Sequence, residues 1–297
     1  MIYILTQLSS NLYDKTTGVK LAEINNWTPI NNFRDIQIEE EDVLIRYGVS
    51  SYPNKDLEFD YVLNKADDIK LASNKLRCSR YLLLHGVLTP TIYIEKDLIE
   101  EFPVLGRRRY HSRGDDIVFI ENRRQLRRDH SNYYVKYIDG IAEYRLHVFR
   151  NLDNPEDYEA IRLCKKINTS GEEHRIRNVE HGYVFKDHYH HDIEIEEDII
   201  REGIRAMKTI GLDFGAIDVL IERETLLPWI LEINTAPRLN KYGRQLYSYY
   251  FNYMVNCGEE LNRDQYSRIR QNEGRYSVPL PIRFRDIVKE EDKQYYR

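Results

Sequence analysis

The sequence predicts an α/β chain, more closely an α+β chain, in which antiparallel sheets predominate after a short opening unit. Apolar runs at residues 2–6 and 43–47, separated by polar segments, predict that opening α/β unit. Strand-like runs follow one another through residues 133–168, which favours antiparallel sheet in the middle of the chain. Near the C-terminal end, runs at residues 215–222 and 229–234 are close enough in sequence to form a hairpin.

The first half contains one clear helical pattern, which follows a small N-terminal α/β domain of residues 1–66. Residues 67–88 place Ile69, Leu76 and Leu83 at helical spacing behind two aspartates, and a glycine ends the pattern. We therefore expect a single helix over this stretch.

The middle of the chain reads as strands joined by charged loops. Apolar runs at residues 91–94 and 102–106 predict strands that lead into a basic loop, RRRYHSRGDD, and the strand after it completes a hairpin. The runs at residues 133–138, 144–150 and 159–168 are the next expected strands.

The last third begins with an expected helix at residues 199–210, closed by Gly211. The predicted hairpin follows, and residues 241–262 are rich in tyrosine and expected to be helical. Residues 262–297 are polar, contain two prolines and show no strong period, so they form an extension without an assigned role.

The composition is that of a folded protein with two or three subdomains, because the chain has 297 residues, 41% hydrophobic and 31% charged. A net charge of −5 argues against a general nucleic-acid partner or an anionic membrane surface. No apolar stretch reaches the roughly 18 residues of a membrane span. The opening residues lack a basic leader, so we expect a cytoplasmic protein. Its three cysteines show no paired spacing and are expected to be buried thiols.

The hairpin places oxygen-bearing side chains together. Strict alternation puts Asp218 on one face of its strand, and puts Glu232 and Asn234 on the face of the next strand opposite to Trp229, Leu231 and Ile233. A turn centred near Thr225 sets Asp218 opposite Glu232, at the short distance of cross-strand neighbours. Two such carboxylates repel unless a cation lies between them, and oxygen ligands of this kind suit Mg²⁺. The alternative is a half-exposed hairpin whose polar face meets water.

This segment resembles the metal-binding hairpin of the ATP-grasp superfamily, which includes glutathione synthetases, ribosomal-protein glutamate ligases and D-alanine ligases. The resemblance extends over most of the chain. The sequence SNKL at residues 73–76 is similar to the family's helix start, with Lys75 facing phosphate, and is followed by a Gly-x-x-x-Pro element at residues 86–90. The resemblance implies ATP with Mg²⁺, or Mn²⁺ in its place, held by Asp218, Glu232 and Asn234. It also implies two ATP-clasping subdomains, at residues 67–137 and 138–261.

Further nucleotide contacts are implied by the same resemblance. The loop after residues 102–106 resembles the one that covers the triphosphate, with Arg107 in place of the usual lysine and Arg108 or Arg109 as alternatives. The segment YVKYIDGIAEYRLHVF resembles the hinge that reads adenine. The implied contacts are the backbone of Lys136, Tyr137 and Ile138 for adenine, Glu143 for ribose, and Arg145 with Lys165 or Lys166 for phosphate.

The activity that the resemblance implies is amide-bond formation: ATP phosphorylates a substrate carboxylate, and an amine attacks the acyl phosphate. Small-molecule or peptide carboxylates and amines are the implied substrates. Arg107 would neutralise charge on phosphate, Arg238 would hold the acceptor carboxylate or the acyl phosphate, and residues 111–115 would act as a lid. Two alternatives stay open: an ATP-binding regulator that does not ligate, and a ligase acting on a protein or nucleic-acid end through the arginines of residues 123–128.

Two other patterns favour ordinary surface roles. Five histidines between residues 174 and 191 lack the spacing of a zinc site, so a solvated loop or a substrate-facing lid is the preferred interpretation. The arginines of residues 123–128 are flanked by Glu121 and Asp129, which suggests pairing at the surface.

Overall fold

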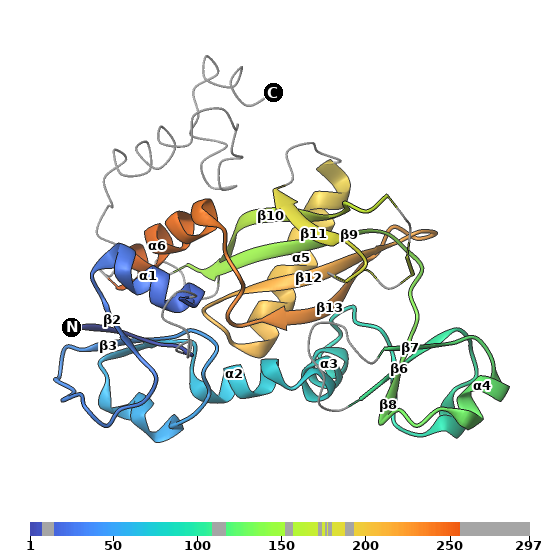
Figure 1. Cartoon of the computed structure of the whole chain (residues 1–297), viewed down its shortest axis with the longest axis horizontal. Coiled ribbons are helices and arrows are strands. Elements are labelled where there is room, and N and C mark those ends of the chain that lie inside the picture. The colour runs from blue at the N-terminus through green and yellow to red at the C-terminus, as the bar shows by residue number, and fades with distance from the viewer. Residues whose placement is uncertain are drawn as a thin grey trace, which may run out of the picture.

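The computed structural model describes residues 1–7, 15–108, 117–151, 157–171, 174–175, 177, 180–187 and 193–255. Its N-terminal unit is a parallel sheet in the order β2-β1-β3-β4 (Figure 1). The elements of this unit are β1 (Ile2–Leu5), α1 (Thr17–Asn25), β2 (Thr28–Ile30), β3 (Val43–Arg46), the 3₁₀ turn η1 (Pro53–Glu58) and β4 (Tyr61–Leu63). The two strands expected here are confirmed, and β2, β4 and α1 are additional.

The single helix expected over residues 67–88 is wrong, because the structure divides it into α2 (Ala66–Ser73) and α3 (Lys75–Leu84). Asn74 lies between them with extended backbone, and its side chain accepts a hydrogen bond from the backbone N–H of Arg77, which starts α3 as a new helix. Because α3 begins as a new helix, the face that it buries differs from the one expected for a single continuous helix. Leu82 is buried, whereas Leu83 is 42% exposed.

A small antiparallel sheet follows, in the order β5-β8-β6-β7. Its elements are β5 (Ile92–Tyr93), the 3₁₀ turn η2 (Lys96–Leu98), β6 (Val104–Arg107), β7 (Val118–Ile120), α4 (Arg123–Arg128) and β8 (Tyr133–Lys136). These elements bury an apolar cluster of their own, formed by Ile99, Val104, Ile120, Leu126 and Tyr134. We refer to residues 92–136 as the small lobe.

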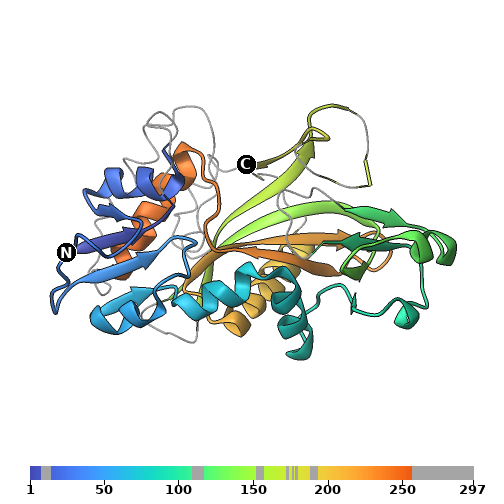
Figure 2. The ribbon, with the colours of Figure 1, turned by 60° about the horizontal axis from the view of Figure 1, so that its bottom comes forward.

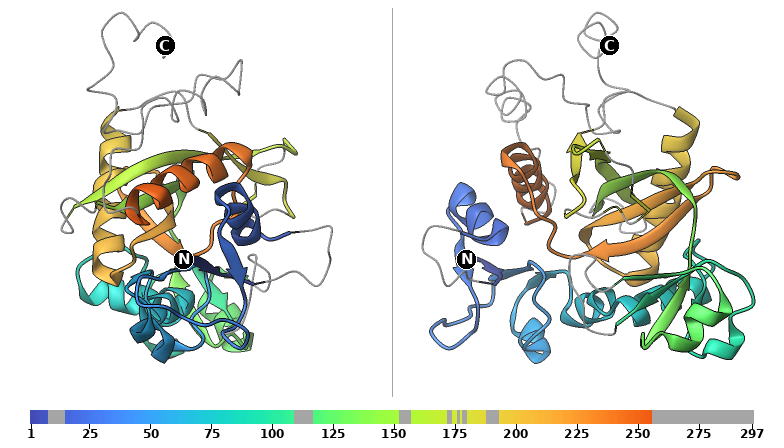
Figure 3. Two further views of the ribbon diagram at one scale, coloured as in Figure 1. Left: turned by 90° about the vertical axis from the view of Figure 1, so that its left-hand side faces the viewer. Right: turned by 45° about the vertical axis from the view of Figure 1, so that its right-hand side comes forward.

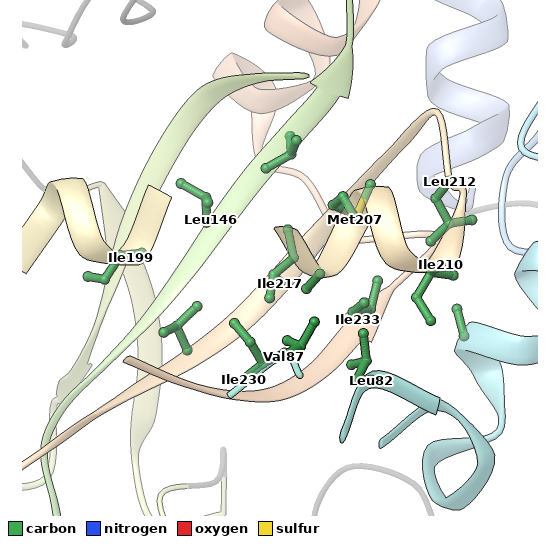
Figure 4. Packing of buried hydrophobic residues seen from close by; sticks show 14 of the residues in the cluster. Leu82, Val87, Leu146, Ile199, Met207, Ile210, Leu212, Ile217, Ile230 and Ile233 are labelled. Carbon is green, nitrogen blue, oxygen red and sulfur yellow. The ribbon is translucent and has the colours of Figure 1, made fainter. Parts of the chain in front are cut away.

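The largest sheet is antiparallel, with the order β11-β10-β9-β12-β13, and lies above α5, α2 and α3 in Figure 2. Its strands and covering helix are β9 (Gly140–Arg150), β10 (Tyr158–Asn168), β11 (Tyr183–Asp187), α5 (Ile193–Ile210), β12 (Phe214–Glu222) and β13 (Pro228–Asn234). Figure 4 shows the core between the sheet and α5, where Ile217 and Ile233 meet Met207 and Ile210. One face of the large sheet is therefore entirely apolar at its centre.

A β-bulge interrupts the strict alternation of side chains that the sequence predicts for β13. Asp218 pairs with Glu232, but the next residue, Val219, pairs with Ile230, which leaves Leu231 as the additional residue. Ile230 is consequently fully buried, while Leu231 is only partly buried. The prediction of strict alternation placed the residues on either side of Ile230 on the apolar face, and it is therefore wrong for β13.

Helix α6 (Lys241–Val255) lies between α1 and the large sheet (Figure 3). Tyr47 and Asn64, which directly follow β3 and β4, form hydrogen bonds with the segments at the two ends of the hairpin of β12 and β13. The Tyr47 hydroxyl donates to the Pro237 carbonyl oxygen at 2.5 Å. The buried Asn64 side chain donates to the Phe214 carbonyl oxygen at 3.0 Å and accepts from the backbone N–H of Asp213 at 2.7 Å. The start of β12 is thus fixed against the end of β4. No helix among the described residues is long and apolar enough to cross a membrane.

Candidate functional site

The face of the large sheet turned away from α5 carries charged and polar side chains from four neighbouring strands. Alternation along β9 and β10 and cross-strand pairing with β12 bring them together, because Cys164, Arg145, Asp218 and Glu232 follow one another across the sheet. The set comprises Glu143, Arg145, His147, Arg162, Cys164, Lys166, Asp218, Glu232 and Asn234.

Asp218 is buried and forms a two-point ion pair with Arg145. The predicted register is confirmed, since Asp218 lies directly opposite Glu232. On its other side Asp218 accepts from Arg145 Nε at 2.6 Å and from Nη2 at 2.8 Å. The guanidinium carbon of Arg145 also lies 4.2 Å from the centre of the Phe185 ring. Burial raises the pKa of the Asp218 carboxyl group, and the bond to Arg145 acts in the opposite direction.

Glu232 is paired with a lysine from another part of the chain. Lys75, the first residue of α3, lies 2.8 Å from Glu232, and the Asn234 amide donates to Glu232 at 3.2 Å. Burial acts to raise the pKa of Glu232, but Lys75, Arg145 and Asn234 together lower it to about 2. A lysine at the start of a helix is disfavoured by the helix dipole. Its pairing with an ionised carboxylate offsets that cost.

Glu143, the residue predicted to bind ribose, is buried and paired with Lys166 at 2.5 Å. Burial raises the pKa of Glu143, while Lys166 lowers it. Lys165, in contrast, is the cross-strand partner of Tyr144, a residue of the apolar core, so it belongs to the opposite face. The structure therefore brings Lys166, and not Lys165, to the face that carries Asp218.

Comparison with solved structures identifies this arrangement of sheets. The VanG D-Ala:D-Ser ligase of Enterococcus faecalis matches with a TM-score of 0.61 and 13% identity, over 86% of this chain and 96% of that one. D-alanine–D-alanine ligase from Bacillus anthracis, in complex with ATP, matches with a TM-score of 0.59 and 13% identity, over 92% and 98%. An Archaeoglobus fulgidus protein assigned to the ATP-grasp superfamily matches with a TM-score of 0.51 and 12% identity, over 80% and 81%. The chain has the ATP-grasp fold. No protein-family model and no curated protein sequence matches it.

The donor chemistry of the hairpin fits the divalent cation expected with an ATP-grasp fold. Asp218 and Glu232 supply carboxylate oxygens on adjacent strands, and Asn234 supplies an amide oxygen one alternation further along β13. Such a set suits Mg²⁺, which accepts few protein ligands and completes its shell with water and phosphate oxygens. The part of the chain that the structure describes has no cluster of three or more His, Cys, Asp or Glu residues suited to a metal.

Arg107 ends β6, and only Arg108 separates it from residues 109–116, which lie outside the described part. Its Nε atom is buried, and no described group accepts a hydrogen bond from it. The lid expected at residues 111–115 and the alternative Arg109 also fall outside the described residues. Arg107 stays the predicted phosphate contact, and its neighbour Arg108 is exposed.

The predicted hinge connects β8 with β9. The backbone N–H groups of Lys136 and Tyr137 donate to the carbonyl oxygens of Thr91 and Pro103, at 2.8 and 3.2 Å. The Lys136 side chain pairs with Glu101 at the surface, and Ile138 is buried. The hinge is thereby held to the small lobe, and its adenine contacts stay a prediction.

The loop that follows Asn234 contains Arg238, which is exposed. A further buried ion pair, not predicted from the sequence, holds the end of this loop. Arg162 bonds Asp187 at 2.6 and 3.0 Å and Asn240 at 3.2 Å, and its guanidinium lies over the Tyr242 ring. The sequence feature that could have pointed to Arg162 is the series of polar residues at every second position of β10, which starts at this residue.

The histidine cluster and the arginines of α4, for which the sequence favours surface roles, have defined neighbours in the described part of the structure. The rings of His174 and His181 stack at 4.3 Å, while the other three histidines of that cluster lie outside the described residues. The expected pairing of the α4 arginines with their acidic neighbours is wrong. Glu121 bonds Arg175 instead, and the Asp129 carboxylate accepts from Ser131 N and Tyr134 Oη.

Two of the three cysteines, Cys78 and Cys164, are buried free thiols, and burial raises the pKa of each to about 12. They are therefore not activated nucleophiles at neutral pH. Cys257 lies outside the described residues.

Proposed function

We propose that the protein is an ATP- and magnesium-dependent ligase that joins a carboxylate to an amine through an acyl phosphate. The observation that carries the proposal is the register of Asp218 with Glu232, with Asn234 on the same strand, within an ATP-grasp fold. Two of the enzymes matched above are named as ligases of D-amino acids, and the structure of one of them is bound to ATP. Both names support a carboxylate and an amine as the reacting groups.

The proposed roles follow from charge and position. Asp218, Glu232 and Asn234 would hold the divalent cation, which when bound neutralises phosphate charge. Lys75 and Arg145 would hold phosphate oxygens. Phosphoryl transfer depends mainly on positioning and charge neutralisation, so a site of charged side chains without an activated nucleophile is sufficient.

The remaining residues complete the proposal. Arg107 would contact phosphate from the small lobe, Glu143 would accept a hydrogen bond from ribose, and the backbone at Lys136–Ile138 would contact adenine. Lys166 replaces Lys165 as the lysine proposed for the nucleotide, because only Lys166 shares the face of Asp218. Arg238 would receive the acceptor carboxylate or the acyl phosphate, since it is exposed just after the metal strand.

The chemical steps balance without a protein nucleophile. A carboxylate oxygen attacks the γ-phosphorus of ATP and ADP leaves, which gives the acyl phosphate. The amine then attacks the acyl carbon and forms the new C–N bond. The bond between that carbon and the phosphate oxygen breaks, phosphate leaves with the electron pair, and the nitrogen loses a proton. The division of one difficult substitution into two easier ones is the general advantage of such an intermediate.

The test is a screen of amino acids and short peptides for ADP release that depends on an added amine, with product masses recorded. In a responsive mixture, Asp218→Asn and Glu232→Gln should each lower ADP release by at least about 100-fold, because each removes a ligand whose charge stabilisation amounts to several kcal/mol. Asp198→Asn is the matched control, since Asp198 pairs with Arg201 on the surface of α5.

Full activity of both site variants would refute the assignment of the metal carboxylates. A protein that is stabilised by ATP analogues in thermal unfolding but never releases ADP would instead be an ATP-binding regulator. ADP release only with a protein acceptor would support the alternative of a macromolecular substrate.

A further inference from the structure

Six ionisable side chains of the candidate site form three pairs of a carboxylate with a cation. Asp218 bonds Arg145, Glu232 bonds Lys75 and Glu143 bonds Lys166. Three carboxylates thus face three cations, so this set of side chains carries no net charge. A site ready for a cation alone would carry a surplus of negative charge.

We propose that the pairs Arg145–Asp218 and Lys75–Glu232 are a charge lock, in which the two cations occupy the metal carboxylates until nucleotide phosphates draw them away. The divalent cation then binds only together with the nucleotide. This inference rests on the proposed function, and it concerns how ligand binding at that site is regulated.

The geometry of the first pair makes the lock strong. Arg145 approaches both oxygens of Asp218, at 2.6 and 2.8 Å, and the Asp218 side chain is only 7% exposed. A divalent cation bound to Asp218 would lie within a few ångströms of the guanidinium. At such separations in a partly buried site, like charges repel strongly, so the cation alone binds poorly.

The nucleotide removes that repulsion because phosphate and carboxylate offer arginine the same kind of acceptor. A guanidinium forms paired hydrogen bonds with either group, so Arg145 can exchange Asp218 for phosphate oxygens without losing bonds. Phe185 lies under the guanidinium at 4.2 Å and keeps it at the site during the exchange. Lys75 is a flexible point charge whose side chain is 33% exposed, so it exchanges Glu232 for phosphate with still less constraint.

A neutral side chain at position 145 tests the lock directly. In Arg145→Gln the amide still donates to Asp218, but the positive charge is gone. Nucleotide-free Arg145→Gln should bind Mn²⁺ at least about tenfold more tightly than the nucleotide-free wild type, since 1.4 kcal/mol of relieved repulsion corresponds to a factor of ten. Binding is measured from the loss of the free Mn²⁺ signal in electron paramagnetic resonance.

Arg162→Gln is the matched control. Arg162 forms the same two-point pair with an aspartate, Asp187, on the same face, but no second carboxylate faces that aspartate across the sheet among the described residues. Its loss should leave Mn²⁺ binding within about twofold of wild type. An equal gain in this control would overturn the proposal, because the effect would then be nonspecific.

Further outcomes separate the lock from the proposed function. Wild-type protein that binds Mn²⁺ without nucleotide as tightly as Arg145→Gln overturns the lock alone. Wild-type protein whose thermal unfolding is unaffected by ATP analogues with Mn²⁺ overturns the proposed function. If Arg145→Gln does not fold, as judged by circular dichroism, Lys75→Met decides: a Mn²⁺ affinity equal to that of wild type then refutes the lock.

Discussion

The pair between Arg145 and Asp218 predicts a large coupling energy in a double-mutant cycle of the nucleotide-free protein. The two charge-assisted bonds are 2.6 and 2.8 Å long, and the side chains are 19% and 7% exposed. Removing one partner of a buried pair leaves an uncompensated charge and typically costs about 3–5 kcal/mol. Because Arg145 retains some contact with water, we expect about 3 kcal/mol for Arg145→Gln and for Asp218→Asn. The double variant leaves no stranded charge, so it should cost no more than either single change, about 3 kcal/mol, giving a coupling energy of about 3 kcal/mol.

The assay is urea unfolding of the four proteins at neutral pH, followed by circular dichroism. Additivity of the two single effects within about 0.5 kcal/mol would refute the pairing, because independent sites add to that precision. A repeat with saturating Mn²⁺ and an ATP analogue should give a smaller coupling energy, since both side chains then have other partners. An undiminished coupling energy would mean that the pair persists when the nucleotide is bound.

Three further predictions concern other contacts. Gly18→Ala should destabilise the protein by about 1–3 kcal/mol in urea unfolding, because a Cβ there would lie 2.3 Å from Oγ1 of the buried Thr6; no change would mean that α1 can move away from β1. Asn64→Ala should cost about 3 kcal/mol, since it strands buried backbone groups. Asn64→Gly should cost about 1 kcal/mol less, because Asn64 has a φ of 61°, and equal losses would contradict that strain. The pKa of Glu232 falls from 4.5 to about 2 on folding, so its stabilisation is complete above pH 4.5 and is lost as the pH falls toward 2. Lys75→Met should make that loss of stability shallower in unfolding measured across the same pH range, and an unchanged slope would show that Lys75 is not the cause.

The central hairpin could be predicted because its information is local. The apolar alternation of β12 and the short turn are both visible in a single segment, and they fix Asp218 opposite Glu232. The partner of Asp218 could not be found in this way. Arg145 is 73 residues away, and its pairing depends on β9 lying beside β12, which no local pattern encodes.

The errors have local physical causes. The apolar spacing on either side of Asn74 is compatible with one continuous helix, and only the capping role of that side chain reveals the break. The bulge at Leu231 adds a residue to one strand without altering its composition, so the sequence shows no sign of it. Strands β2 and β4 have three residues each, too few for any period to be recognised. Lys165 and Lys166 are chemically identical neighbours, and only the register with Tyr144 distinguishes them.

The separate apolar cluster of the small lobe has a consequence for motion. No residue between 92 and 136 belongs to the three other apolar clusters of the described structure. The ion pair of Glu121 with Arg175, which joins the lobe to the loop after β10, has both side chains more than half exposed. Such exposed pairs are weakened by salt. The lobe should therefore rotate as a rigid body about its junction with β9, and its resting angle should depend on ionic strength, while the large sheet stays unaffected.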